Sequence, residues 1–384
     1  MTLKLADRVL GLKPSATVEM TEKVRAARAA GRRVIGLSSG DPNITTDARI
    51  VAAAERALRD GDTHYGPPAG TAALREAVAA REARLSGATY DPADIIITPG
   101  GKFALLTSLM AQVEPGDEVL VPVPGWVSYE PCVRLCGGTP VRLDMLDRID
   151  PDKIAAAVTP RTKAIILNSP ANPTGRVIPQ AELEMVADLA RRHDFWIVFD
   201  QVYGDLVHDG PFHRMQSIAA VRDRVFVVDS LSKTFGMTGW RLGYLALPPG
   251  LAKPVLKFIQ HSIYCLPGFV QAAGVEALSL YDELAPTYRA LFRARLERAA
   301  ARLDAIPGIA CTVPDAAFYL FPAVDAPDTE VARHWLDTID VAAMPGSSFG
   351  GMGAGHLRLS VTCSDADLDE ALDRIARLGL PKAA

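Results

Sequence analysis

Lys233 stands in a segment rich in hydroxylated and glycine residues, Ser230 to Gly236, that separates two apolar stretches. The stretches, Val225 to Val228 and Leu242 to Leu247, are short and uncharged, as buried strands are. A lysine beside a strand end can lose solvent, and its amine then becomes nucleophilic toward a carbonyl. The first chemistry that this sequence suggests is therefore attack of an amine on a carbonyl group.

Three polar side chains in the same segment suit a phosphate. Ser230 and Ser232 carry hydroxyls, and Arg241, eight residues after the lysine, presents a planar fork of donors. Taken alone, this pattern also fits an ordinary solvated loop, because most Lys and Arg side chains beside loops are simply hydrated. The choice between the two interpretations depends on features elsewhere in the chain.

Gly100-Gly101-Lys102 is a second candidate for binding an anion. It follows a predicted strand, Asp94 to Thr98, and opens a predicted helix, Lys102 to Val113. Backbone N–H groups and the helix dipole favour an anion at such a point. Glycine turns before helices are common, however, so this signal is weak by itself.

Two more features follow predicted strands. Asp200 ends the strand Phe195 to Phe199, with Tyr203 three residues on, and Asn172 lies in a proline-rich turn, Asn168 to Gly175. In isolation, the aspartate reads as a helix N-cap and the turn as purely structural. Together, the four features supply an amine, an anion cradle, a carboxylate, a phenol and an amide.

Pyridoxal phosphate needs this set of groups. Its aldehyde takes a lysine as a Schiff base, its ring nitrogen pairs with an aspartate, and its phosphate takes backbone N–H groups, hydroxyls and an arginine. An aspartate that keeps the ring nitrogen protonated makes the ring an electron sink. We therefore predict pyridoxal 5'-phosphate as the cofactor.

Predicted strands and helices alternate through the middle of the chain, from Asp94 to Leu247. Such alternation is typical of an α/β fold with a mostly parallel sheet sandwiched by helices, whose ligands gather at the carboxyl ends of the strands. After a long predicted helix, Pro286 to Ile306, short strands and two helices indicate a smaller α+β domain. We place the large domain at residues 46–285 and the small domain at residues 1–45 plus 286–384.

Composition limits the functions open to this chain of 384 residues. Its 49% hydrophobic and 22% charged residues are ordinary for a soluble globular protein, and its net charge of −4 gives no reason to expect nucleic acid. We expect no membrane span and no secretory signal. Five scattered cysteines favour reduced thiols in the cytoplasm, and their spacing predicts no metal site.

The sequence closely resembles the fold-type I pyridoxal phosphate aminotransferases, and among them the aspartate aminotransferase-like class I/II group. The resemblance covers nearly the whole chain, and its motifs come in the family's order. They are Gly40-Asp41-Pro42, Tyr65 with Gly70, Gly100-Gly101-Lys102, Trp126, Asn168-x-Pro170-x-Asn172-Pro173-Thr174-Gly175, Asp200-x-x-Tyr203, Ser230-x-Ser232-Lys233, Gly239-Trp240-Arg241-x-Gly243-Tyr244 and Arg358-Leu359-Ser360. So many ordered matches do not arise by chance.

The resemblance implies a role for each motif residue. Lys233 would form the Schiff base and then move a proton between the substrate Cα and the cofactor. Asp200 would pair with the ring nitrogen, Tyr203 and Asn172 would hold the 3′ oxygen, and Trp126 would stack on the ring. The phosphate would be surrounded by Gly100, Gly101, Lys102, Ser230, Ser232 and Arg241.

The resemblance also implies how substrate and subunits are arranged. Arg358 would take the substrate α-carboxylate, with the backbone of Gly40 nearby and Trp126 and Asn172 bordering the substrate. Tyr65 would reach the phosphate of the neighbouring subunit, so we expect a homodimer. A side-chain carboxylate of an acidic substrate would be held by Ser15, Thr17 and Lys102.

Several positions depart from the family pattern. Gly125 stands where a Tyr or Phe is usual, which predicts a larger pocket, and Tyr264 would refill part of it. Gln201 stands where Glu is frequent. We therefore expect an aminotransferase that moves an amino group between an L-amino acid and a 2-oxo acid by a ping-pong mechanism. These departures leave open whether aspartate is its preferred amino donor.

Two other functions fit parts of the sequence. A pyridoxal phosphate β-lyase, such as a carbon–sulfur lyase, shares the lysine, aspartate and arginine, so these residues separate it poorly from a transaminase. A ligand-sensing domain fused to a transcription factor would need an attached DNA-binding module, and the N-terminal segment is too short and not basic enough to be one.

Overall fold

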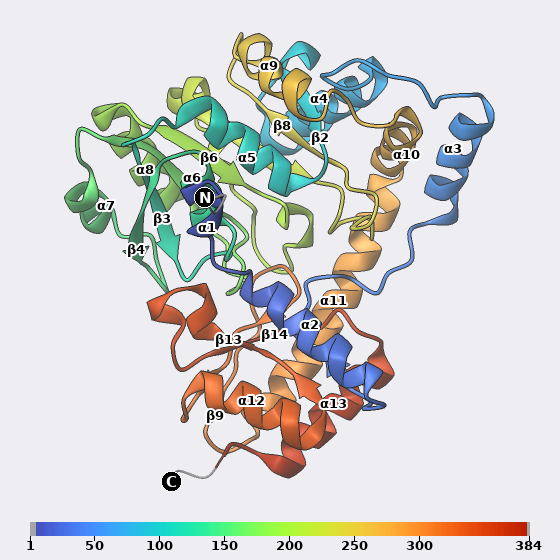
Figure 1. The fold of residues 1–384 in the computed structure, drawn as a ribbon, viewed down its shortest axis with the longest axis vertical. Helices are drawn as coiled ribbons and strands as arrows, with labels where there is room; N and C mark the ends of the chain where they lie inside the picture. The colour runs from blue at the N-terminus through green and yellow to red at the C-terminus, as the bar shows by residue number, and fades with distance from the viewer. Residues whose placement is uncertain (1–4, 382–384) are drawn as a thin grey trace, which may run out of the picture.

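The structure is a computed structural model that describes residues 5–381, and a seven-stranded sheet forms its centre (Figure 1). The strand order is β2-β8-β7-β6-β5-β3-β4, and within this sheet β8 runs antiparallel to both neighbours. The other paired strands, from β7 to β4, are parallel. The strands are β2 (Ile95–Thr98), β3 (Glu118–Val123), β4 (Thr139–Asp144), β5 (Thr162–Asn168), β6 (Trp196–Asp200), β7 (Val225–Ser230) and β8 (Gly243–Ala246). The predicted α/β fold class is confirmed.

Helices cover both faces of this sheet, because its strands are apolar on both sides. Along β6, Ile197 and Phe199 belong to one hydrophobic core and Val198 to another, as the alternation of side chains along a strand requires. The first core includes residues of α3 (Ala48–Arg59), α4 (Ala72–Ser86), α7 (Pro151–Ala157), α8 (Gln180–His193) and α10 (Gly268–Ser279). The second includes residues of α5 (Gly101–Gln112), α6 (Tyr129–Leu135) and α9 (Ala252–Ser262).

A further core lies below the sheet in Figure 1 and is reached by the long helix α11 (Tyr281–Asp304). Leu284, near the start of α11, packs in the core of the large sheet, whereas Phe292 packs in the further core. The remaining strands pair in small sheets: β1 (Ile35–Gly36) with β12 (Val341–Ala342), β9 (Ile309–Ala310) with β11 (Ala323–Val324), and β14 (Leu357–Ser360) with both β10 (Tyr319–Leu320) and β13 (Met344–Pro345). The remaining helices are α1 (Asp7–Leu10), α2 (Ala16–Ala29), α12 (Asp328–Ile339) and α13 (Asp365–Leu378).

The parallel pairing of β1 with β12 joins the N-terminal segment to the C-terminal part of the chain. Met20 and Val24 of α2 accordingly pack in one core with Leu336 of α12 and Met344 of β13, and Figure 1 shows α2 in the lower part of the molecule with the C-terminal elements. This arrangement agrees with a small domain made of both ends, although the boundaries 1–45 plus 286–384 and 46–285 stay a prediction. Short 3₁₀ turns occupy Pro92–Asp94, Gly204–Leu206, Met215–Ser217, Ala219–Arg224, Gly346–Phe349 and Gly351–Gly353.

Some elements differ from the sequence-based expectation. The prediction missed α6 and α7, which are only seven residues each, and it started α11 at Pro286 instead of Tyr281. A proline is a common helix start, but here Pro286 lies inside the helix, which tolerates one missing N–H. Among residues 5–381, no helix is long and apolar enough to cross a membrane, and the cysteines are all free thiols.

Gly243 of β8 generates a prediction about packing at the sheet's edge. A Cβ there would lie 2.7 Å from the carbonyl carbon of Gly100 and 2.8 Å from the backbone oxygen of Asp229. Gly243→Ala should therefore lower the free energy of unfolding by about 1–3 kcal/mol through overpacking, measured by urea denaturation. Gly239→Ala is the matched control, since a Cβ at Gly239 meets nothing within 4 Å. Equal stability of the two variants would contradict this packing.

Candidate active site

A cavity of about 370 Å³ opens at the carboxyl edge of the large sheet, a size in the usual range for small-molecule sites. Asn168, Asp200 and Ser230 end the adjacent strands β5, β6 and β7 and contribute to its wall. The predicted residues that line it are Thr17, Gly40, Gly101, Lys102, Trp126, Asn172, Asp200, Tyr203, Ser230, Ser232, Lys233, Arg241 and Arg358. Residues far apart in the chain thus meet at the carboxyl ends of the strands, where the alternation of strands and helices predicted a ligand site.

Three predicted site residues do not line this cavity. Gly100 is the N-cap of α5, and a Cβ there would lie 2.6 Å from Nη2 of Arg241. The hydroxyl of Ser15 is 2.9 Å from that of Thr17, so Ser15 contacts a lining residue instead of the cavity. Tyr65 is 86% exposed and packs edge-on against Tyr264, with ring centroids 5.0 Å apart.

Lys233 reaches the centre of the cavity from the turn after β7. Its Nζ donates a hydrogen bond of 2.7 Å to the backbone oxygen of Gly40, from the segment after β1. Burial, helped by the cations of Arg358 and Arg241 and opposed by Asp41, lowers the pKa of Lys233 from its ordinary value to about 8. A sizeable fraction of this amine is therefore neutral, and so nucleophilic, near pH 8.

Asp200 is buried at the end of β6, and its carboxylate has two donors. Oδ2 accepts a hydrogen bond of 2.7 Å from the hydroxyl of Tyr129, and Oδ1 accepts one of 3.3 Å from the backbone N–H of Val202. Burial raises the pKa of Asp200 to about 6, and the bond from Tyr129 opposes this rise. Near neutral pH the carboxylate is therefore mostly ionised and can accept a hydrogen bond from an N–H group of a ligand.

Arg358 of β14 is a buried cation whose hydrogen bonds go to neutral oxygens. Nη1 donates to Oδ1 of Asn172 at 2.9 Å, and Nη2 donates to the backbone oxygen of Ser38 at 2.6 Å. The guanidinium lies over the rings of Tyr319 and Phe349, at 4.5 and 4.8 Å from their centroids. Since a buried charge is normally paired, this geometry suits an incoming carboxylate.

The corner beside α5 collects hydrogen-bond donors. The hydroxyl of Ser230 is 2.8 Å from that of Ser232, and Nη2 of Arg241 reaches the backbone oxygen of Pro99 at 3.2 Å. Gly100 adopts φ 82°, a conformation that favours glycine, and its missing side chain leaves room for the arginine. Hydroxyls, a guanidinium and the N-terminus of α5 together form a donor set that fits a phosphate.

Sequence reasoning missed two tyrosines of the cavity wall. Tyr129 bonds Asp200, and the hydroxyl of Tyr319 is 3.0 Å from that of Tyr203. Tyr129 follows Trp126 by three residues in the short helix α6, but spacing alone does not reveal that it reaches β6. Tyr319 belongs to the short strand β10, and the sequence does not show that its hydroxyl reaches Tyr203.

The expected enlargement of the pocket by Gly125 is not supported. Gly125 lines a separate, smaller cavity of about 50 Å³, and a Cβ there would lie 2.7 Å from the backbone oxygen of Pro122. Tyr264 lies against Tyr65 and is not part of the wall around Lys233. Within one chain, neither departure from the family pattern changes this cavity, because both residues lie outside it.

The fold and the site define an α/β enzyme with a partly buried lysine at the carboxyl edge of its sheet. The family model for aminotransferase class I and II matches residues 32–375. The aspartate aminotransferase of Geobacillus stearothermophilus is 38% identical over 395 residues, which cover 98% of each chain. The aspartate/prephenate aminotransferase of Thermus thermophilus is also 38% identical, over 97% of this chain and 98% of its own.

Solved structures agree with these relatives. The Thermus thermophilus aspartate aminotransferase with maleate has a TM-score of 0.92 and 36% identity, over 98% of this chain and 100% of that one. An aromatic aminotransferase from Pyrococcus horikoshii OT3 has a TM-score of 0.87 and 34% identity, over 92% and 98%.

The chain belongs to the class I and II aminotransferases. It is an enzyme that transfers amino groups, and the relatives support this activity over the β-lyase alternative. Members of this family are pyridoxal phosphate enzymes.

The lowered pKa of Lys233 can be measured on the amine itself. In cofactor-free protein, acetylation of Lys233 by acetic anhydride should be half-maximal near pH 8, because the neutral amine reacts and its pKa is about 8. An ordinary lysine, with a pKa of about 10.4, reaches this point more than two pH units higher. Mass spectrometry of the labelled peptide gives the profile, with the Lys253 peptide of the same digest as internal reference. A midpoint above about pH 10 would show that the amine is hydrated.

Proposed function

We propose that this aminotransferase binds pyridoxal 5'-phosphate in the cavity around Lys233 and moves amino groups between an L-amino acid and a 2-oxo acid by a ping-pong mechanism. The observation that carries the proposal is the convergence, in one cavity, of a partly buried amine whose pKa is lowered, a buried carboxylate and a cluster of phosphate-type donors. When bound, the cofactor supplies an aldehyde that bonds to an amine and a protonated ring that withdraws electrons from the substrate Cα.

Each part of the cofactor has matching residues in the cavity. The N–H groups that open α5 at Gly101, the hydroxyls of Ser230 and Ser232, and Arg241 form the donor set for the phosphate, with Gly100 leaving them room. The carboxylate of Asp200 would hold the proton of the ring nitrogen, and its ionisation is supported by the bond from Tyr129. Tyr203 and Asn172 would hold the 3′ oxygen, and Trp126 would cover the ring.

Lys233 would act first as the amine that bonds the cofactor and then as the base at the substrate Cα. A base that works near neutral pH needs a pKa near the operating pH, and burial brings the pKa of Lys233 to about 8. The backbone oxygen of Gly40, 2.7 Å from Nζ, orients the amine in the cavity. Enclosure by protein also keeps water from competing for the proton.

Arg358 would hold the substrate α-carboxylate, because its guanidinium is buried and bonded to neutral oxygens only. Thr17 and Lys102 are the polar groups proposed for a side-chain carboxylate, with Ser15 supporting Thr17. Nζ of Lys102 lies 5.1 Å from the ring centre of Trp126, at the wall of the same cavity. Together with the aspartate aminotransferases among the relatives, these residues support aspartate or glutamate as an amino donor.

The proposed assembly is a homodimer in the cytoplasm. Tyr65 lies outside its own cavity, is 86% exposed and packs on Tyr264, which supports its use by a neighbouring subunit. A large exposed aromatic pair is otherwise unfavourable in contact with water. Free thiols at all cysteines among residues 5–381 support a reducing compartment.

Lys233→Ala tests the proposed function directly. Without the amine, transfer from aspartate to 2-oxoglutarate should fall by at least about 1,000-fold, since nucleophile and base are lost together. Borohydride should no longer fix cofactor to the purified chain, as shown by the intact mass. Lys253→Ala, an exposed lysine on α9, is the control and should behave as the parent. Normal turnover or borohydride fixation in Lys233→Ala would refute the proposal.

Lys102→Met tests the recognition of acidic substrates. Loss of a charge-assisted hydrogen bond should lower kcat/KM for aspartate and glutamate on the order of 10-fold or more, with a much smaller effect on alanine and aromatic donors. Initial rates with 2-oxoglutarate as acceptor measure this ratio, and Lys257→Met on the surface of α9 is the control. An equal loss for all donors would assign Lys102 to the cofactor instead of the substrate side chain.

A further inference from the structure

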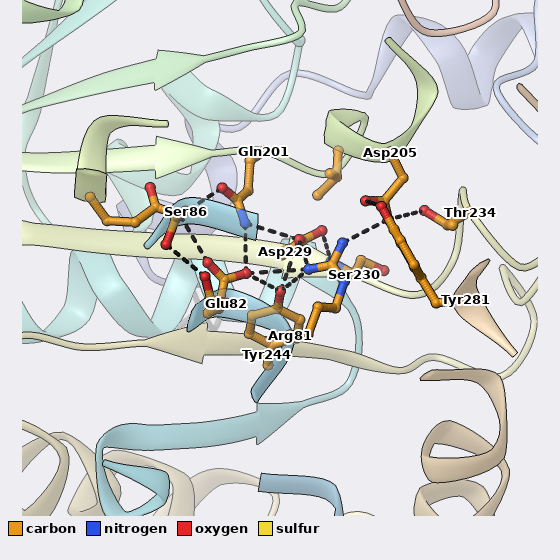
Figure 2. A network of polar contacts seen from close by, with 12 residues as sticks. Arg81, Glu82, Ser86, Gln201, Asp205, Asp229, Ser230, Thr234, Tyr244 and Tyr281 are labelled. Atoms are coloured by element: carbon orange, nitrogen blue, oxygen red, sulfur yellow. Dashed lines mark hydrogen bonds and ion pairs between the residues drawn. The ribbon is translucent and has the colours of Figure 1, made fainter. Parts of the chain in front are cut away.

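A buried polar network lies beside the cavity, around Arg81 and Glu82 of α4 (Figure 2). Its members come from distant parts of the chain, and their side chains are almost completely excluded from solvent. They include Arg81, Glu82, Gln201, Asp205, Gln216, Asp229 and Tyr244. A polar cluster of this size costs much desolvation, so each charge needs a partner.

Arg81 is the centre of this network. Its guanidinium contacts Asp205 at 2.6 Å, Asp229 at 3.0 Å and Glu82 at 3.2 Å. Burial and the neighbouring carboxylates raise the pKa of Asp229. For Asp205, Arg81 and Arg214 overcome the effect of burial and lower the pKa. The Arg81 guanidinium therefore contacts carboxylates that come from three different elements of the fold.

Gln201 completes the network with an amide. Its Nε2 donates to Glu82 at 2.9 Å and to Asp229 at 3.1 Å. A glutamate at this position would bring a further negative charge against these two carboxylates, whereas the amide supplies a donor. The departure from the family pattern at Gln201 thus has a physical account in this chain.

Two hydrogen bonds join this network to the turn that carries Lys233. The backbone N–H of Ser230, before the lysine, donates to Oδ1 of Asp229 at 2.6 Å. The hydroxyl of Thr234, after the lysine, donates to Oδ2 of Asp205 at 2.8 Å. Figure 2 shows these two carboxylates on either side of the Arg81 guanidinium. The cation therefore links both ends of the segment from Ser230 to Thr234.

We propose that Arg81 is a positioning residue for Lys233, because it clamps Asp229 and Asp205, which in turn hold the two ends of the lysine turn. Arg81 is not among the residues that line the cavity, so it acts only through these carboxylates. The clamp fixes the turn and keeps the amine enclosed. Its bearing on catalysis rests on the proposed function of Lys233, whereas the clamp itself is a property of the chain without cofactor.

The competing explanation is that apolar packing alone holds the turn. Leu231 lies within this segment, Phe235 follows it, and both are buried in the core of the large sheet. Thr234→Val separates the two explanations, because valine keeps the shape of threonine and the apolar packing but removes the bond to Asp205. Thr107→Val is the matched control: Thr107 is equally buried in α5, and its hydroxyl has no hydrogen-bond partner among the described residues.

The readout is the pH profile of Lys233 acetylation in cofactor-free protein. The charged groups that act on the amine, Asp41, Asp200, Arg241 and Arg358, are the same in both variants. Because burial is the main cause of the low pKa of Lys233, a loosened turn should admit water and raise the midpoint. We expect a rise of at least half a pH unit in Thr234→Val and no change in Thr107→Val.

Arg81→Met is the second variant and removes the guanidinium itself. It should also raise the Lys233 midpoint, and it should lower the temperature of unfolding, since it removes the cation that contacts three buried carboxylates. If this variant does not fold, Thr234→Val still decides. An unchanged midpoint in folded Thr234→Val would overturn the clamp and favour apolar packing. Failure of the proposed function would appear separately, as normal turnover of Lys233→Ala, and would leave this measurement unaffected.

Discussion

Polar groups buried at one edge of an apolar sheet are the constraint on which this molecule depends. A buried charge without a partner is costly, so each ionisable group at the edge must be paired or have a shifted pKa. The pKa of Lys233 is lowered mainly by burial, and its Nζ donates a hydrogen bond to a neutral backbone oxygen. Asp200 is hydrogen-bonded by Tyr129, and Arg358 is stacked between aromatic rings. These solutions leave reactive groups in the cavity that are held in place but not neutralised.

The alternation of side chains along the strands separates reactive groups from supporting ones. On β6 and just beyond it, Asp200 lines the cavity while the next residue, Gln201, joins the Arg81 network. On β7, Ser230 lines the cavity while the preceding residue, Asp229, joins the network. Adjacent residues therefore serve opposite sides of the same sheet. A one-residue change of register would exchange the two sets, which ties the site to the hydrophobic pattern of the strands.

The alternating pattern of the sequence predicted the fold class, and its ordered motifs, through the family resemblance, predicted most residues of the cavity wall. Uncharged strands and ordered motifs such as Asp200-x-x-Tyr203 are visible without coordinates. Contacts between distant segments are not. Tyr129 reaches Asp200 across 71 positions, and Arg81 reaches Asp229 across 148. The predicted start of α11 was wrong because Pro286 is a strong local signal for a helix start, whereas the helix begins at Tyr281. The helix α2 begins at Ala16, and its first turn brings Thr17 to the cavity wall.

Arg81 also explains why a network so rich in carboxylates persists beside a site that needs its own negative charge. If the carboxylates of Glu82, Asp205 and Asp229 were not compensated, their field would add to that of Asp200 and favour protonation of the whole cluster. The guanidinium confines this charge to the far side of β7, where Tyr244 and Gln201 supply further donors. Asp200 is then governed first by its own burial and by Tyr129, and Asp229 of the network adds a smaller effect that also raises its pKa. The cation in the interior thus weakens the influence of the supporting network on the cavity.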